Sequence, residues 1–145
     1  MNPVWSLKLV REAVPVYTIG SSTEVYDLIK QFIFPKLVTS NVERFYFLGM
    51  NLANQVLLID EHSVGGVSEA RVYIAEIAKK LLLCNAGRVI LVHNHPSGTL
   101  RCSDADICLT SKLNAALAYF DISILDHLIV GAEAADFISK ELGYI

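Results

Sequence analysis

The fold of this 145-residue chain is decided by the stretch RVILVHNHPSGTLRCSDAD, which runs from Arg88 to Asp106. The run from Arg88 to Val92 is apolar and rich in β-branched residues, so it predicts a buried strand. His93 and His95 follow it directly. Because side chains alternate between the two faces of a strand, these two imidazoles point to the same side.

The second half of the stretch predicts a turn and then a helix. Pro96–Gly98 breaks the strand, and Ser103 opens a helix that carries Asp106 in its first turn. A strand end and a helix start thus bring together two imidazoles and a carboxylate, a ligand set suited to Zn²⁺. Three protein ligands leave the fourth position of a tetrahedral ion open for water, as in catalytic rather than structural zinc sites.

Each of these residues also has a purely structural interpretation. A single histidine among apolar residues is usually part of the core, but a pair on one face at a strand end favours a site. Ser103 and Asp106 have the spacing of a capping box. The Ser103 hydroxyl can cap the helix and still face a site. For Asp106 we expect the two roles to compete, because a metal-bound carboxylate is less free to reach back to the N-cap.

A zinc site that activates water also needs a carboxylate that takes the proton and delivers it to the leaving group. The candidates are Glu43, Glu61 and Glu69. Glu43 begins a predicted strand and Glu61 ends one, so either could reach a site at the end of a sheet. Spacing alone does not choose among the three.

Outside this stretch, hydrophobic periodicity predicts alternating helices and strands. The expected elements are a helix capped by Ser21 and ended by Pro35, a hairpin over 43–50 and 55–60 with 61–64 as an optional continuation, a helix over 69–84 capped by Ser68, a helix over 103–119, a strand over 122–130 that Asp126-His127 interrupts, and a short helix over 134–142. This order is typical of a single three-layer α/β or α+β domain. We assign residues 21–145 to that domain and residues 1–20 to an N-terminal arm or edge strand.

The chain is unusually apolar, with 53% hydrophobic residues and a mean hydropathy of +0.44. Its uninterrupted apolar runs are shorter than the roughly 18 residues that a membrane span needs. We therefore expect no membrane association, and the apolar excess favours a large core or a homodimer contact. The first residues lack the basic region and apolar stretch of a signal peptide, which predicts a cytoplasmic location.

Charge and cysteine content exclude further classes of protein. The net charge is −3 and the longest basic run is Lys79-Lys80, so composition does not support direct nucleic-acid binding. Three cysteines without CxxC spacing argue against a disulfide framework and against a cysteine-rich zinc site. Cys102 borders the candidate metal loop, where a small apolar filler is a more frequent role than a metal ligand.

The motif residues carry a family resemblance. The pattern His93-x-His95, followed after seven residues by Ser103-x-x-Asp106, resembles the JAMM motif of the MPN+/JAB metallopeptidases. The segments HNHPSG at 93–98 and LDHLIVG at 125–131 make the chain similar to the bacterial RadC family, from about residue 23 to residue 143.

The resemblance implies a cytidine-deaminase-like JAB/MPN fold with a mixed sheet flanked by helices, and one Zn²⁺ held by His93, His95 and Asp106. It implies that Ser103 stabilises the oxyanion of a tetrahedral intermediate and that Glu43 is the general base. The activity that it implies is a zinc-dependent, metallopeptidase-like hydrolysis of a peptide or isopeptide amide, with a peptide or protein as the substrate partner.

Two questions stay open at this point. His127 could be a partner of a metal ligand, a substrate contact or a buried structural histidine. The RadC family is also associated with DNA repair, so the alternative function is a repair-associated or mobile-element accessory module whose metal site is structural or vestigial. A zinc nucleobase deaminase is disfavoured, because that class uses His-x-Glu with Pro-Cys-x-x-Cys and this chain has no CxxC.

Overall fold

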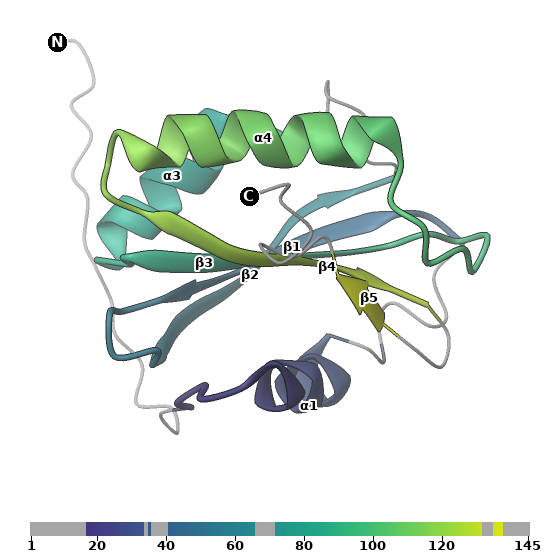
Figure 1. The fold of residues 1–145 in the computed structure, drawn as a ribbon, viewed down its shortest axis with the longest axis horizontal. Coiled ribbons are helices and arrows are strands. Elements are labelled where there is room, and N and C mark those ends of the chain that lie inside the picture. The colour runs from purple at the N-terminus through teal and green to yellow at the C-terminus, as the bar shows by residue number, and fades with distance from the viewer. Residues whose placement is uncertain (1–16, 34, 36–40, 66–71, 132–134, 138–145) are drawn as a thin grey trace, which may run out of the picture.

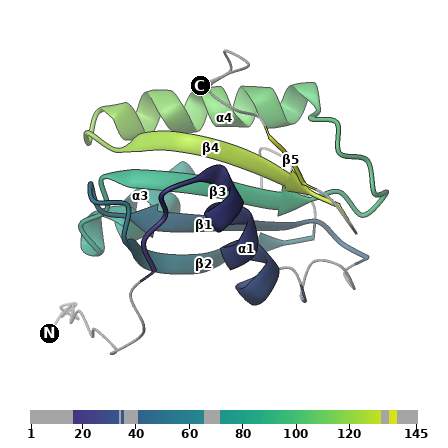
Figure 2. The same ribbon diagram turned by 60° about the horizontal axis from the view of Figure 1, so that its bottom comes forward.

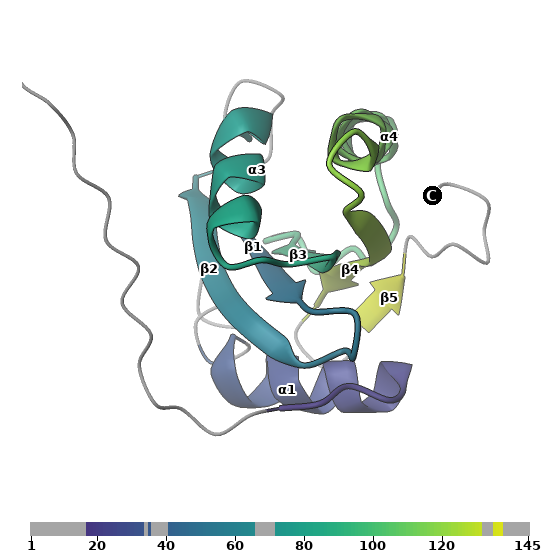
Figure 3. The same ribbon diagram turned by 90° about the vertical axis from the view of Figure 1, so that its left-hand side faces the viewer.

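A mixed five-stranded sheet forms the centre of the structure, a computed structural model that describes residues 17–33, 35, 41–65, 72–131 and 135–137. The elements are α1 (Ser22–Phe32), β1 (Arg44–Met50), β2 (Val56–Val64), α3 (Ile74–Leu83), β3 (Arg88–Asn94), α4 (Asp104–Ala118), β4 (Ser123–Val130) and β5 (Ala135–Phe137). Helix α1 lies on one face of the sheet, and α3 and α4 lie on the other (Figures 1 and 3). The predicted three-layer α+β fold is confirmed.

The strand order is β2-β1-β3-β4-β5. Strand β1 is antiparallel to both β2 and β3, and β4 is antiparallel to β5. The pair β3–β4 is parallel, so the chain must cross the sheet between them, and α4 makes that crossing. This connection places the start of α4 next to the carboxyl end of β3, where the two candidate metal-binding segments meet.

Both faces of the sheet are buried, and the side chains of β1 show how. Phe45 and Phe47 pack into the cluster beneath α3 and α4, whereas Tyr46 and Leu48 pack into the cluster over α1. Figure 2 shows α1 lying across its face of the sheet. A strand covered on both sides needs apolar residues at successive positions, which explains much of the high hydropathy of this chain.

The start of α1 is close to its prediction. The Ser21 hydroxyl accepts a hydrogen bond from the Glu24 amide at 3.3 Å, as expected for an N-cap. The Glu24 carboxylate accepts from the amide of Gly20, one residue before the cap, rather than from Ser21 itself. The helix buries Val25, Leu28, Ile29 and the following Ile33 against the sheet.

Helix α3 begins later than predicted. Ser68 and Glu69 lie outside the described residues, but Val72 and Tyr73 are described and are not helical. Tyr73 has the extended dihedral angles φ −95° and ψ 105°, and its amide donates to Nε2 of His62 on β2 at 2.9 Å. A tertiary contact, rather than a local capping side chain, therefore marks the start of this helix.

The predicted helix over 134–142 is wrong where the structure describes it. Ala135–Phe137 forms β5 and pairs with β4, with Leu128 opposite Phe137. An open strand edge offers unpaired backbone groups, and pairing with it outweighs a weak local helix preference. The interruption that we predicted in β4 is also absent, because His127 continues the strand.

Residues 1–16 of the predicted arm lie outside the described residues. Where the description begins, Thr18 forms an isolated antiparallel bridge with Gln55 at the start of β2. Among the described helices, none combines the length and the apolar character that crossing a membrane requires.

Candidate metal centre

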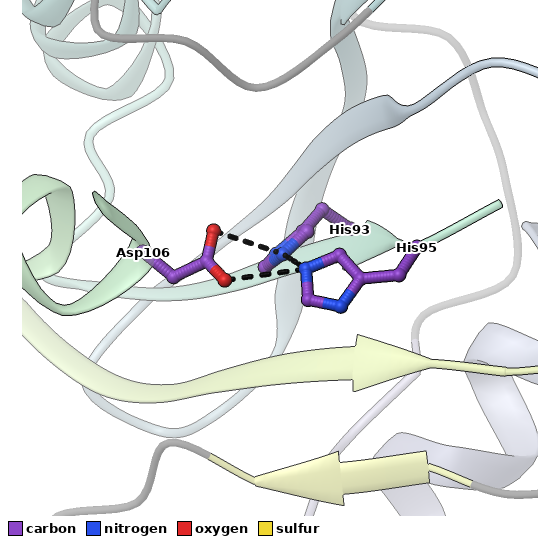
Figure 4. A group of neighbouring side chains, drawn as sticks. All are labelled: His93, His95 and Asp106. Atoms are coloured by element: carbon purple, nitrogen blue, oxygen red, sulfur yellow. Dashed lines mark hydrogen bonds and ion pairs between the residues drawn. The ribbon is translucent and has the colours of Figure 1, made fainter. Parts of the chain in front are cut away.

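Three side chains converge where β3 ends and α4 begins (Figure 4). The Nε2 atoms of His93 and His95 lie 3.0 Å apart. His93 Nε2 is 3.2 Å from Oδ1 of Asp106, and His95 Nε2 is 3.2 Å from Oδ2 of the same carboxylate. His93 and Asp106 are buried, whereas His95 is partly exposed. The predicted ligand set is thus brought together as a group that could hold a metal ion.

The donor chemistry of this cluster fits a cation. His95 Nδ1 lies 2.9 Å from the carbonyl oxygen of Thr99, which can only accept, so Nδ1 carries the proton of the neutral ring. The bare Nε2 then faces other acceptors at 3.0–3.2 Å. Ligands bound at the 2.0–2.1 Å typical of zinc lie about 3.3 Å apart around a tetrahedron, close to these separations.

The His95 ring and the Asp106 carboxylate shift each other's pKa in opposite directions. The protonated His95 ring donates a hydrogen bond from Nε2 to Asp106, which raises the pKa of His95 against the lowering effect of burial. Burial alone would raise the pKa of the Asp106 carboxyl, but the facing rings of His93 and His95 hold it well below its usual range. The carboxylate is therefore ionised and available to a metal ion.

The capping role of Asp106 does not remove it from the site. Its amide donates to Ser103 Oγ at 3.1 Å, and the Ser103 amide donates to Asp106 Oδ2 at 2.8 Å, which completes the capping box. The same carboxylate directs one oxygen at each histidine. The expected competition between the two roles is not seen in the geometry, because the first turn of α4 aims the cap and the carboxylate in one direction.

Glu43 immediately precedes β1 on the strand next to the histidines. Phe45 lies opposite His93 in the antiparallel pair of β1 and β3. Extending this register by two residues places Glu43 opposite His95 and on the same face of the sheet. The negative charge of Glu43 is close enough to contribute to the raised pKa of His95. The structure thus brings this candidate carboxylate near His95.

The other two candidates differ. Glu61 pairs with Tyr46, whose ring packs on the α1 face, away from the histidines. Its carboxylate accepts from the Tyr46 hydroxyl and forms an ion pair with Arg44 at 3.1 Å. Glu69 lies outside the described residues. Alternation along the strands, rather than distance along the sequence, separates Glu43 from Glu61.

Comparison with known proteins agrees with this arrangement. The model of the RadC-like JAB domain matches residues 19–143 of the chain. The chain belongs to the RadC family. A UPF0758 protein of Ralstonia pickettii is 38% identical over 126 residues, covering 86% of this chain and 56% of the relative. Relatives of the same name from Ralstonia nicotianae and Saccharophagus degradans are 39% and 40% identical and cover 82% and 77% of this chain.

The chain spans about half the length of the curated relatives that it matches, with 54% of the Ralstonia nicotianae protein and 50% of the Saccharophagus degradans protein covered. The matched region contains every candidate residue of the metal centre from Glu43 to His127. Cys102 is half-buried and lies outside the group of described residues that could hold a metal ion.

Two residues that sequence reasoning left open or missed lie directly behind this RadC-type centre. His127 Nε2 is 2.8 Å from His93 Nδ1, and His127 Nδ1 is 2.6 Å from the Thr110 hydroxyl. Complete burial lowers the pKa of His127 well below its usual value. Thr110 follows Asp106 by four residues on α4, a spacing that places both on one helix face and was the available signal.

Asn94, between the two histidines, points to the opposite face and holds the segment that carries Glu43. Its side-chain oxygen accepts from the Arg44 amide at 2.7 Å, and its nitrogen donates to the Val42 carbonyl at 3.2 Å. The Gly65 amide donates to the carbonyl of Glu43 at 2.7 Å. The main chain on both sides of Glu43 is therefore fixed, a role that nothing in the local sequence pattern indicated.

Proposed function

We propose that this RadC-like JAB domain is a zinc-dependent hydrolase of the JAMM type that cleaves a peptide or isopeptide amide. The observation that carries the proposal is the convergence of His93, His95 and Asp106 beside the start of β1, where Glu43 lies. Two imidazoles and one carboxylate form the ligand set of hydrolytic zinc sites that keep an open position. A peptide or protein substrate is part of the same proposal.

Zn²⁺ bound by these three residues would polarise the scissile carbonyl and lower the pKa of water. Glu43 takes the proton of the attacking water and delivers it to the leaving amine. The Ser103 oxygen already accepts the Asp106 amide, so its hydroxyl proton remains to be donated. We assign that proton to the oxyanion that develops on the substrate carbonyl.

The fixed backbone around Glu43 supports its assignment as the proton carrier. A general base must stay within hydrogen-bond reach of the water that it deprotonates, and small displacements are costly. Asn94 and Gly65 bind main-chain groups of Val42, Glu43 and Arg44, so the backbone that carries this carboxylate is held in place. Its partial exposure leaves it open to substrate and water.

The test combines a metal measurement with a cleavage assay. Wild-type protein is loaded with zinc and incubated with two probes, a fluorogenic linear peptide library and a fluorogenic library of peptides joined through a lysine side chain. We expect cleavage that a chelator abolishes and added zinc restores. Glu43→Gln should keep one zinc per chain and lose at least about 100-fold in rate, in line with the loss of a general base.

The matched control is Glu61→Gln, which changes the same type of side chain on the opposite face of the sheet. This variant should retain both zinc and cleavage. Cleavage of either library by Glu43→Gln at the wild-type rate, or cleavage that is indifferent to zinc, would contradict the proposed mechanism.

A further inference from the structure

Behind the metal centre, a chain of hydrogen bonds leads from His93 into the core. His93 Nδ1 lies 2.8 Å from Nε2 of His127, and His127 Nδ1 lies 2.6 Å from the Thr110 hydroxyl. Thr110 Oγ1 lies 2.7 Å from the main-chain carbonyl oxygen of Asp106. The chain therefore begins at one metal-facing residue and ends on the backbone of another.

The direction of every hydrogen bond in this chain follows from its last member. A carbonyl oxygen only accepts, so the Thr110 hydroxyl donates its single proton to Asp106. That hydroxyl must then accept from His127, which places a proton on His127 Nδ1. Full burial favours the uncharged ring, so His127 Nε2 is bare and accepts from Nδ1 of His93.

These hydrogen bonds determine whether His93 Nε2, the ring nitrogen that faces the metal centre, carries a proton. A neutral His93 that carries its proton on Nδ1 has a bare Nε2. This Nε2 is the atom that lies 3.0 Å from His95 Nε2 and 3.2 Å from Asp106 Oδ1. The opposite tautomer would direct an N–H group at the position of the ion and could not bind it. The hydrogen bond at one ring nitrogen thus decides what the other nitrogen can do.

We propose that Thr110 and His127 form a relay that holds His93 in the tautomer whose bare Nε2 faces the metal ion, with the Asp106 carbonyl as its anchor. Both are positioning residues, since His127 has no exposed surface and touches His93 rather than substrate. The inference rests on the metal site of the proposed function and is independent of hydrolysis. Asp106 takes part in both the relay and the metal site. Its main-chain carbonyl anchors the relay, and its carboxylate is available to the ion.

Packing leaves the rings little freedom to choose another partner. The rings of His93 and His127 have centroids 4.8 Å apart, and the Phe45 ring lies against both, at 6.2 Å and 5.7 Å. His93, His127 and Thr110 are all fully buried. A buried ring nitrogen that lost its partner would stay unpaired. Packing against Phe45 therefore favours the same hydrogen-bond partners for His93 and His127 as the relay requires.

The first test reads the tautomer directly. Long-range ¹H–¹⁵N spectra of zinc-free protein at pH 8, with a chelator present, distinguish a protonated from a bare ring nitrogen. We expect Nδ1 protonated and Nε2 bare in both His93 and His127. A wild-type His93 that carries its proton on Nε2 would overturn the proposal, and no variant is needed for that result.

The second test uses Thr110→Val, which removes the hydroxyl and keeps the shape of the side chain. We expect mixed tautomers at His127 and His93, and a zinc affinity about 10- to 100-fold weaker by competition with a chromophoric chelator. Thr110→Ser restores the hydroxyl and should restore both readouts. Thr18→Val is the matched control, because Thr18 is exposed, pairs with Gln55 away from the metal centre and should tolerate the exchange.

A folded Thr110→Val protein with the wild-type tautomers and affinity would overturn the relay. If this variant does not fold, His127→Gln replaces it, since an amide oxygen can accept from His93 Nδ1 and should keep that proton in place. Loss of the Nδ1 proton in a folded His127→Gln protein would also contradict the proposal. A domain that shows the expected tautomers and binds zinc but cleaves no peptide would remove the proposed function and leave this inference intact.

Discussion

The two histidines of the metal centre leave the same strand two residues apart, yet different parts of the fold hold them. His93 is fully buried, and the side chain of His127 in the core binds its Nδ1. His95 is partly exposed, and a main-chain carbonyl in the loop after β3, that of Thr99, binds its Nδ1. One ligand is therefore set by tertiary packing and the other by a local loop.

This difference indicates how the centre combines precision with access. The His93 side of the centre depends on three elements at once, because β3, β4 and α4 each supply a member of the relay. The His95 side depends on the short loop after β3. The contact that holds His95 Nδ1 there is with a main-chain carbonyl and not with another side chain. A change in the core should therefore disturb His93 and the fold together, whereas a change in the loop should disturb only metal binding.

The largest expected effects come from removing each ligand. His93→Ala and His95→Ala should both weaken zinc binding by more than the roughly 100-fold expected for an outer partner. Only His93→Ala should also lower the free energy of unfolding of the zinc-free protein, by about 2–4 kcal/mol, because it leaves a cavity and an unpaired His127 nitrogen. Urea unfolding measures this, and equal stability of the two variants would refute the contrast between core and loop.

Asn94, between the two histidines, allows a test of how the Glu43 segment is held beside β3. Asn94→Ala removes the hydrogen bonds that hold the main chain around Glu43, so we expect a 10- to 100-fold lower kcat, equivalent to about 1–3 kcal/mol. Zinc stoichiometry should not change. Asn51→Ala is the matched control, because Asn51 fixes the turn at the other end of β1 through Ala53 and Gln55 and should leave kcat unchanged.

A smaller effect should separate the loop from the core. Gly98 has φ +79°, a left-handed conformation, and its amide donates to the His95 carbonyl. A Cβ at this position would meet no atom within 4 Å, so Gly98→Ala costs only backbone strain, about 1 kcal/mol. We expect roughly 5-fold weaker zinc binding with the His93 tautomer unchanged. A changed tautomer would show that the loop and the core are not independent.

The smallest effect concerns His62, which lies outside the metal centre and accepts a hydrogen bond as a neutral ring. Burial, and then the charge of Lys80, lowers the pKa of His62 below its usual value. The unfolded chain therefore binds a proton at its ordinary pKa of about 6.5 before the folded chain does, so stability is lost as pH falls below that value. The bond from the Tyr73 amide, lost on protonation, contributes about 1 kcal/mol.

This pH dependence is measured by urea unfolding of zinc-free wild type and His62→Gln between pH 7 and pH 5. The difference between the two proteins cancels the contribution of His127. His62→Gln should show the shallower loss of stability towards pH 5. Parallel curves would mean that His62 does not carry this part of the pH dependence.

Local features of the fold followed the sequence closely. Ser21 and Ser103 begin α1 and α4 as N-caps, and the two histidines share one face of β3. Each of these depends on neighbours within about four residues, so periodicity and capping rules suffice. The predicted start of α3 and the helix predicted over 134–142 were wrong. The contacts that decide these segments, with His62 and with β4, come from residues distant in the chain.

The metal centre divides along the same line. The sequence alone determined that His93 and His95 face one way and that Asp106 begins the next helix, because strand alternation and the capping spacing are local. The family resemblance pointed to Glu43, but only the tertiary structure showed that Glu61 packs on the opposite face of the sheet and that the His127 ring contacts His93 Nδ1. Those choices depend on how β1 and β4 align with β3, and the packing of both sheet faces sets that alignment.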